Sequence, residues 1–93
     1  YVYDVQIKST NTIVDNKISA NSVLQAYYNF NGSSDLSKIE WFEWTNGVNN
    51  KIAEGSILNP ALVLRNMIIS FVVTPYDGTT YGVPIESKTL YIV

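Results

Sequence analysis

The fold of this 93-residue chain is decided by the stretch Ile69–Gly78, ISFVVTPYDG. Its first six residues alternate between two faces and are rich in β-branched and aromatic side chains, which favours a buried strand. Pro75 cannot donate to a strand ladder, and Asp77 followed by Gly78 is a preferred turn sequence. The pattern therefore predicts a strand that ends at Pro75 and a chain reversal directly after it.

A second strand, expected at Lys38–Thr45, carries an aromatic centre. Because successive side chains of a strand point to opposite faces, Trp41 is expected to face the core while Phe42 and Trp44 face the other way. Asn46-Gly47 follows directly and is a strong signal for a tight hairpin turn. The two strands together indicate a β-sandwich.

The remaining segments also favour strands with turn residues between them. A short continuation at Ile13–Val14 is expected to switch from one sheet to the other. Helix is the competing interpretation for Ala61–Met67, although that segment is short for a helix. Strands are expected at Tyr1–Lys8 (with Tyr1, Tyr3, Val5 and Ile7 on one face), Val23–Phe30, around Lys51–Ala53, Ile57–Leu58, Ala61–Leu64 and Ile85–Val93.

The composition supports one folded domain and argues against catalysis. Hydrophobic residues make up 46% of the chain and charged residues 15%, which is enough apolar surface for a core without metals or disulfides. Cysteine and histidine are absent, so disulfides, thiol chemistry, the commonest general base and the commonest soft-metal ligand are all missing. We therefore expect no enzyme, and no catalytic, cofactor or metal site.

Charge and hydropathy argue against two further classes of function. The net charge is -2, and no basic stripe is present that could neutralise phosphates, so nucleic-acid binding is not expected. The longest apolar runs, such as Met67–Ile69, are far shorter than the ~20 residues that span a bilayer. Membrane insertion is therefore not expected either.

The carboxylates are the only candidates for catalysis or metal binding. Glu40 and Glu43 lie on opposite faces of one predicted strand, so they cannot pair across a cleft as the two acids of a glycosidase do. Loop carboxylates could assemble a calcium site, but the chain has no Asp-x-Asp-x-Asp-Gly spacing. Asp77 is better explained as the turn residue before Gly78. The loop carboxylates concerned are Asp15, Asp35, Glu54 and Asp77.

About seven short strands, with turn signals between them and no convincing helix, are typical of an immunoglobulin-like antiparallel β-sandwich with Greek-key topology. The sequence begins inside its first predicted strand and ends inside its last. We therefore expect residues 1–93 to form a single domain that belongs to a longer, multidomain protein.

Several segments resemble a known family, the cysteine-free immunoglobulin-like repeats of bacterial and archaeal surface proteins and of tailed-phage structural proteins. The resemblance implies a non-catalytic module for display, spacing or adhesion, in phages as a capsid or tail decoration, on the virion surface or the cell surface. It carries over no functional residues. The resembling positions are Leu24–Phe30 (LQAYYNF), Ile39–Phe42 (IEWF), Ile69–Gly78, Gly82 and Ser87.

Large apolar side chains are expected on the outward face of the sheet that contains the two central strands. Strand alternation places Phe42, Trp44, Val72 and Tyr91 on that face. If the patch is contiguous it marks an interface, because aromatic side chains are enriched at binding hot spots. The alternative is that they are isolated exposed aromatics, which are ordinary, or that Trp44 covers the adjoining hairpin.

Two tyrosines offer a second contact surface. Tyr76 and Tyr81 flank the predicted turn at Asp77-Gly78 and could either contact a partner or clamp the turn. We expect a module that binds other protein subunits of a virion or surface assembly, with glycans as a second class of partner. The alternatives are a repeat domain or a carbohydrate-binding accessory module of a cell-surface protein, in which Trp44, Tyr76 and Tyr81 would stack on sugar rings, or a spacer that binds no ligand.

Overall fold

The computed structural model describes residues 1–93 and is built from strands, with one short 3-10 turn and no α-helix. The all-β class is therefore confirmed. No helix long and apolar enough to cross a bilayer is present. The strands are β1 (Val2–Ser9), β2 (Lys17–Ile18), β3 (Leu24–Phe30), β4 (Lys38–Thr45), β5 (Val48–Glu54), β6 (Ile57–Leu58), β7 (Ile68–Thr74), β8 (Ile85–Glu86) and β9 (Leu90–Ile92).

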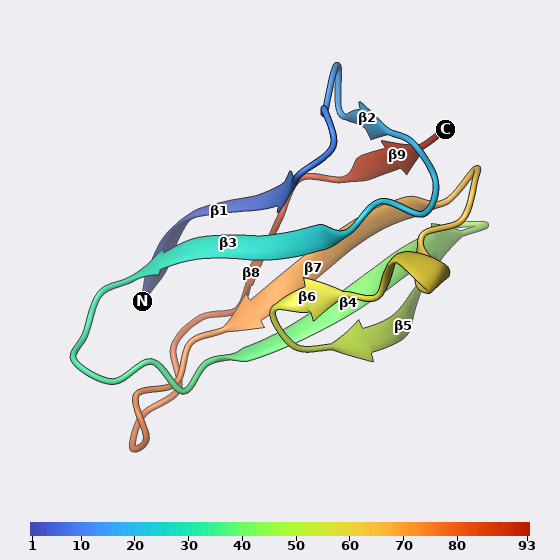
Figure 1. The fold of residues 1–93 in the computed structure, drawn as a ribbon. Coiled ribbons are helices and arrows are strands. Elements are labelled where there is room, and N and C mark those ends of the chain that lie inside the picture. The colour runs from blue at the N-terminus through green and yellow to red at the C-terminus, as the bar shows by residue number, and fades with distance from the viewer.

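The strands form two layers (Figure 1). The three-stranded sheet has the order β1-β3-β6, and the six-stranded sheet has the order β2-β9-β7-β4-β5, with β8 also paired to β7. All pairs are antiparallel except β2 with β9, which run parallel. The chain thus passes between the layers several times, and the apolar sides of both sheets meet between them.

Trp41 lies at the centre of the core between the sheets, and its side chain is fully buried. Its ring lies 5.1 Å from that of Phe71, its cross-strand partner on β7. The indole N–H donates to the carbonyl of Gly55 at 2.8 Å, so the one polar atom of this large side chain is satisfied. Ile39, Ile69 and the other inward residues of β4, β7 and β9 are buried around it, as the alternation predicted.

The β4–β5 hairpin confirms the turn signal. Asn46 and Gly47 have φ angles of 51° and 76°, and Thr45 pairs with Val48 across the turn. Two successive positive φ angles are the requirement of a type I′ turn, which Asn-Gly meets at low cost. β5 extends over Val48–Glu54, well beyond the short edge strand expected around Lys51–Ala53.

The first strand does not keep one regular alternation, so the prediction that Tyr1, Tyr3, Val5 and Ile7 share a face is wrong. A bulge interrupts the pairing of β1 with β3 between Tyr3 and Gln6, and Asp4 inside it has a φ of 53°. The extra residue reverses the alternation. The residue buried before the bulge is Val2, whereas Tyr1 and Tyr3 are exposed; Val5 and Ile7 are half-buried after it.

The switch between sheets occurs at β2 instead of at Ile13–Val14. Val14 and Lys17 exchange two backbone hydrogen bonds, of 3.1 and 3.0 Å, around a turn at Asp15-Asn16 with φ angles of 53° and 59°. This turn delays the crossover, so that Lys17 and Ile18 pair with the last strand.

Neither interpretation of the segment after β6 is correct, because Pro60–Leu62 forms a 3-10 turn where we expected a strand over Ala61–Leu64 or a helix over Ala61–Met67. Asn59 caps the turn, since its side-chain oxygen accepts a hydrogen bond from the N–H of Ala61 at 2.9 Å. Proline in the first position favours such a turn. Local capping therefore overrides the apolar pattern.

The C-terminal strand is also interrupted. Ser87 separates β8 from β9: its N–H donates to the carbonyl of Phe71 at 2.8 Å, and its hydroxyl accepts from the N–H of Phe71 at 3.0 Å. The serine side chain thus takes the place of a backbone carbonyl in the ladder. A continuous strand over Ile85–Val93, as predicted, is not formed.

The two tryptophans of β4 offer a test of this core. Trp41→Phe removes a satisfied hydrogen bond and part of a buried ring, so it should lower the free energy of unfolding by about 2–3 kcal/mol. Trp44→Phe is the matched control: it removes an indole N–H that has no hydrogen-bond partner, so the relieved cost of that unpaired group offsets the lost ring area, and the free energy of unfolding should fall by less than about 1 kcal/mol. Urea denaturation measures both, and equal losses would contradict the central role of Trp41.

Candidate functional site

The outer surface of the six-stranded sheet carries large apolar side chains. We call the set Phe42, Trp44, Ile68, Val72 and Tyr91 the aromatic face. Phe42, Ile68, Val72 and Tyr91 each neighbour a buried, inward-facing residue on their own strand and therefore point away from the core, and Trp44 lies two residues after Phe42 on the same face of β4. The outward side of these strands is apolar, as the alternation predicted, but not all of these side chains are neighbours of one another.

Trp44, Ile68 and Tyr91 form one row across β4, β7 and β9. Ile68 pairs with Tyr91, and Glu43 pairs with Ile69, which places Trp44 opposite Ile68. Together with Asn46, Gly47 and Thr89, these three side chains line a shallow hollow of about 320 Å³. Tyr91 remains 46% exposed at its rim. The row is therefore both apolar and open to a partner.

Trp44 has an unusual polar atom in this row. Its indole nitrogen is buried, and it is the only buried side-chain nitrogen or oxygen without a hydrogen-bond partner. An unmade hydrogen bond of this kind costs about 1–3 kcal/mol. A group that displaced the side chain slightly and accepted this hydrogen bond would recover that cost.

Phe42 and Val72 are placed differently. Phe42 lies in the next row, opposite the fully buried Ser70, whose hydroxyl donates to Glu86 at 2.8 Å. Val72 lies one row further on, between Glu40 and Glu86. Val72 therefore belongs to the charged end of the face, and only Phe42 continues the apolar row.

Ion pairs mark that charged end. Lys51 contacts Glu54 at 2.9 Å and Glu40 at 3.0 Å, and Lys38 lies 3.7 Å from Glu40. The hydrogen bonds to Glu54 and then Glu40 raise the pKa of Lys51, and the same contact with Lys51 lowers the pKa of Glu54. Exposed pairs of this kind add little stability, but they give the face an apolar half and a charged half.

The two loop tyrosines lie at the other end of β7. Tyr76 and Tyr81 stack with ring centroids 4.2 Å apart, and the Tyr76 hydroxyl donates to the carbonyl of Gly78 at 2.9 Å. They clamp the loop after Pro75, although Tyr81 remains 68% exposed. The structure does not bring them together with Trp44, which the sugar-stacking alternative would need on one surface.

Ile68 and Thr89 are the residues of the hollow that sequence reasoning missed. The predicted strand began at Ile69, so Ile68 was not considered. Extending the outward positions backward from Val72 through Ser70 reaches Ile68, and this signal was available. The alternation also predicts that Thr89, two positions before Tyr91, points outward, but this small polar residue was not among the expected contact residues.

Two of the loop carboxylates, Asp35 and Asp77, have separate local partners. Asp77 accepts from the N–H groups of Thr79 and Thr80 at 2.9 and 2.7 Å, and Asp35 accepts from the Tyr28 hydroxyl and the Ser37 N–H at 2.8 and 3.0 Å. No three Asp, Glu, His or Cys side chains gather in a way that could hold a metal ion. The turn interpretation of Asp77 is confirmed by these bonds.

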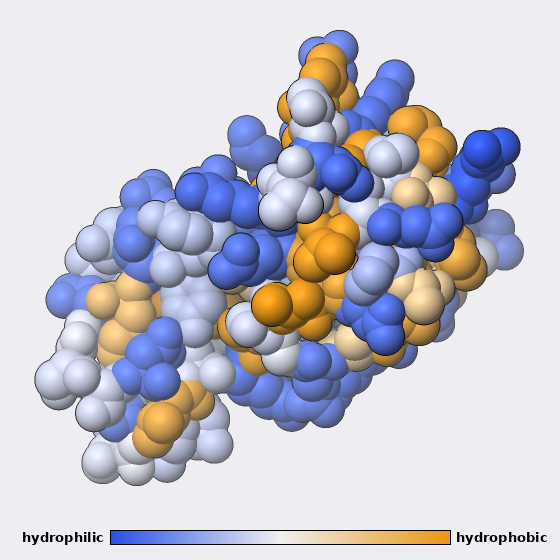
Figure 2. Space-filling model, in the orientation of Figure 1, coloured by the Kyte–Doolittle hydropathy of each residue, from blue (hydrophilic) through white to orange (hydrophobic).

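The opposite side of the molecule also exposes apolar residues. Figure 2 is seen from the side of the three-stranded sheet and shows hydrophobic residues across the middle of a largely hydrophilic surface. No hollow and no unpaired buried donor accompany these residues. The aromatic face is therefore the better candidate. The exposed residues next to or within β6 are Val23, Ile57, Leu62 and Leu64.

Comparison of the chain with protein-family models, with curated proteins and with solved structures finds no match. The functional argument therefore depends on the geometry of the fold and its surfaces.

The Asp77 turn makes a prediction about pH. The hydrogen bonds from Thr80 and then Thr79 hold the pKa of Asp77 below its ordinary value. Because the pKa is lower in the folded state, Asp77 stabilises the fold above its unfolded-state pKa, and this contribution is lost as the pH falls through the folded-state pKa. NMR titration of the carboxyl carbon should give a midpoint below the model-peptide value. A midpoint at or above that value would contradict the turn geometry. Thr10→Ala changes a threonine in another loop, so the Asp77 midpoint should be the same in this control variant as in the unaltered chain.

Proposed function

We propose that the chain is a non-catalytic immunoglobulin-like module that binds a protein partner through the aromatic face. The strand neighbours support the fold assignment: β1-β3-β6 and β9-β7-β4 correspond to strands A-B-E and G-F-C of an immunoglobulin sandwich. β5 then takes the edge position beside C. Trp41 packs on Phe71 where antibody domains have a disulfide.

The single observation that carries the binding role is the row Trp44, Ile68 and Tyr91 around one hollow. Aromatic side chains with an apolar centre and a polar rim are typical of interface cores. The buried indole nitrogen of Trp44 has no partner within the chain. A protein partner offers a backbone carbonyl that could accept this hydrogen bond while its apolar side chains fill the hollow.

The proposed setting is the surface of a virion, as a capsid or tail decoration, or alternatively the surface of a bacterial or archaeal cell. This part of the proposal rests on the resemblance of the segments around Leu24–Phe30, Ile39–Phe42 and Ile69–Gly78 to immunoglobulin-like repeats of such proteins. Its partners would be other subunits of the same assembly. The absence of histidine and cysteine supports a role without catalysis.

A carbohydrate-binding role is the second candidate, because Asn46 and Thr89 add polar groups beside the two aromatic rings of the hollow. Sugar recognition combines a stacking ring with hydrogen-bonding side chains. The central position of Ile68 favours a protein surface over a sugar. A glycan array would show binding if the second candidate is correct.

A pair of matched tyrosines tests the protein-binding role. Tyr91→Ser removes an anchor of the aromatic face, whereas Tyr81→Ser removes a tyrosine that is at least as exposed at the opposite end of the domain. In cosedimentation with particles or envelopes of the source, Tyr91→Ser and Trp44→Ser should each weaken binding by about thirtyfold, as expected for a 2 kcal/mol hot spot.

Tyr81→Ser should bind like the unaltered chain, and the thermal midpoints of the variants should stay within about 4 °C of the parent. Equal binding by the Tyr91→Ser and Tyr81→Ser variants would exclude the aromatic face as the contact surface. If the unaltered chain binds on a glycan array and not to a protein, and Tyr91→Ser loses that glycan binding, the carbohydrate-binding role is supported instead.

A further inference from the structure

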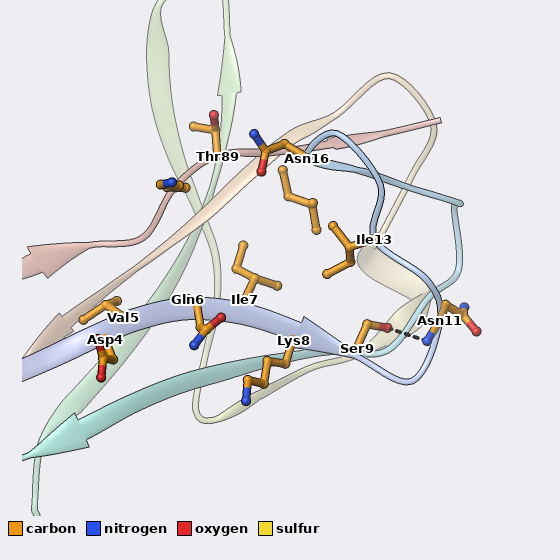
Figure 3. A pocket seen from close by; sticks show the side chains of 12 residues that line it. Asp4, Val5, Gln6, Ile7, Lys8, Ser9, Asn11, Ile13, Asn16 and Thr89 are labelled. Carbon is orange, nitrogen blue, oxygen red and sulfur yellow. Dashed lines mark hydrogen bonds between the residues drawn. The ribbon is translucent and has the colours of Figure 1, made fainter.

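A second open surface lies along the side of the sandwich, between β1 of one sheet and the end of the last strands of the other (Figure 3). It is a groove of about 660 Å³. Val5 and Ile7 from β1, Ile13 from the following loop and Leu90 from β9 provide its apolar lining. Val5, Ile7 and Ile13 are only partly buried although they pack against the core. The core is therefore incompletely covered on this side.

The backbone of β1 borders the groove with an unpaired edge. β1 is the last strand of its sheet, and its only partner is β3. Opposite Ile7 lies Ala26, whose N–H donates to the carbonyl of Ser56 at 2.8 Å and so points away from β1. In an antiparallel ladder this makes Ile7 and Ala26 a non-hydrogen-bonded pair, so the N–H and C=O of Ile7 point outward. Ser9 lies two residues further along β1, so its N–H and C=O also point outward.

Both ends of this edge are defined by the chain. The bulge at Asp4 ends the regular part of β1 on one side. On the other side the crossover to β2 closes the groove, where the carbonyl of Asn16 accepts from the N–H of Tyr91 at 2.8 Å. The regularly paired stretch between them, Gln6–Ser9, corresponds to about 13 Å of strand. The groove is therefore long enough for a short extended segment but not for a longer strand or a helix.

The charges at the groove indicate the chemistry of its occupant. Lys8 and Lys88 line it against a single carboxylate, Asp4, although the chain as a whole has a net charge of -2. The Lys8 ammonium lies 3.8 Å from the centre of the Tyr27 ring, which holds it on the outer surface beside the free edge. If a further strand lay beside β1, its side chains on the same face of the sheet as Lys8 would therefore meet a positive charge.

We propose that this groove accepts an extended acidic segment of another protein as an added strand along β1. The segment hydrogen-bonds to the outward N–H and C=O groups of Ile7 and Ser9, as in other cases of strand addition to a sheet edge. Its apolar side chains alternate inward, over Ile7 and Ile13, and its carboxylates alternate outward, toward Lys8. The site is distinct from the aromatic face and does not depend on it.

The test uses the whole chain and a synthetic hexapeptide, acetylated and amidated, in which valine alternates with aspartate. On titration, the NMR amide signals of Ile7 and Ser9 should shift and gain protection from hydrogen exchange, while those of Phe42 and Trp44 stay unchanged. A peptide with lysine in place of aspartate should bind at least about tenfold more weakly, because charge complementarity is lost. Lys8→Glu should weaken binding of the aspartate peptide, and Lys38→Glu, away from the groove, should not.

Two N-methylated peptides separate strand addition from side-chain contact alone. One carries the methyl groups on the valine nitrogens and the other on the aspartate nitrogens. Because alternate N–H groups of a strand point to opposite edges, only one of the two peptides should lose binding.

Equal binding by both methylated peptides would overturn the proposal, as would the absence of any shift at Ile7. Sedimentation of the chain alone as a dimer, with Ile7 already protected, would show that the occupant is a second copy and not an acidic segment.

Discussion

The packing of Trp41 is the interaction on which the rest of the structure depends. Its ring contacts Phe71 on the neighbouring strand, and its indole N–H is bonded to the carbonyl of Gly55. Gly55 directly precedes Ser56, whose carbonyl accepts from Ala26 on β3. A single side chain of the six-stranded sheet therefore fixes the point at which the chain crosses to the three-stranded sheet, and satisfying its one polar atom makes that burial favourable.

Both proposed binding surfaces follow from this arrangement. With Trp41 inward, the pleat of β4 directs Phe42 and Trp44 to the outer surface. The large aromatic residue in the core and the aromatic outer face therefore both follow from the alternation of one strand. The groove arises from the other layer. The turn at Asp15-Asn16 delays the crossover of the chain to β9, so the edge of β1 faces an open side instead of a paired strand. An unpaired edge of this kind is a natural template for another strand.

Prediction from sequence succeeded where local signals and burial agree. The limits of β4 were predicted to the residue and those of β7 to within one residue, because alternation, β-branched side chains and flanking turn residues all indicate the same structure there. The errors occur where a single polar residue changes the local geometry. Asp4 introduces a bulge, Asn59 caps a 3-10 turn, and the hydroxyl of Ser87 replaces a carbonyl in the ladder. Such substitutions of one hydrogen bond for another leave no periodic pattern to detect.

The sequence by itself determined the all-β class, the central strands, the Asn46-Gly47 turn and the outward direction of Phe42, Trp44 and Tyr91, because each of these depends on neighbours within a few positions along the chain. Only the tertiary structure decided which outward residues touch. It joined Trp44 to Tyr91 through Ile68, placed Val72 among carboxylates, moved Tyr76 and Tyr81 to the opposite end, and opened the groove beside β1. These relations depend on strand order and register, which are set by contacts between residues far apart in the sequence.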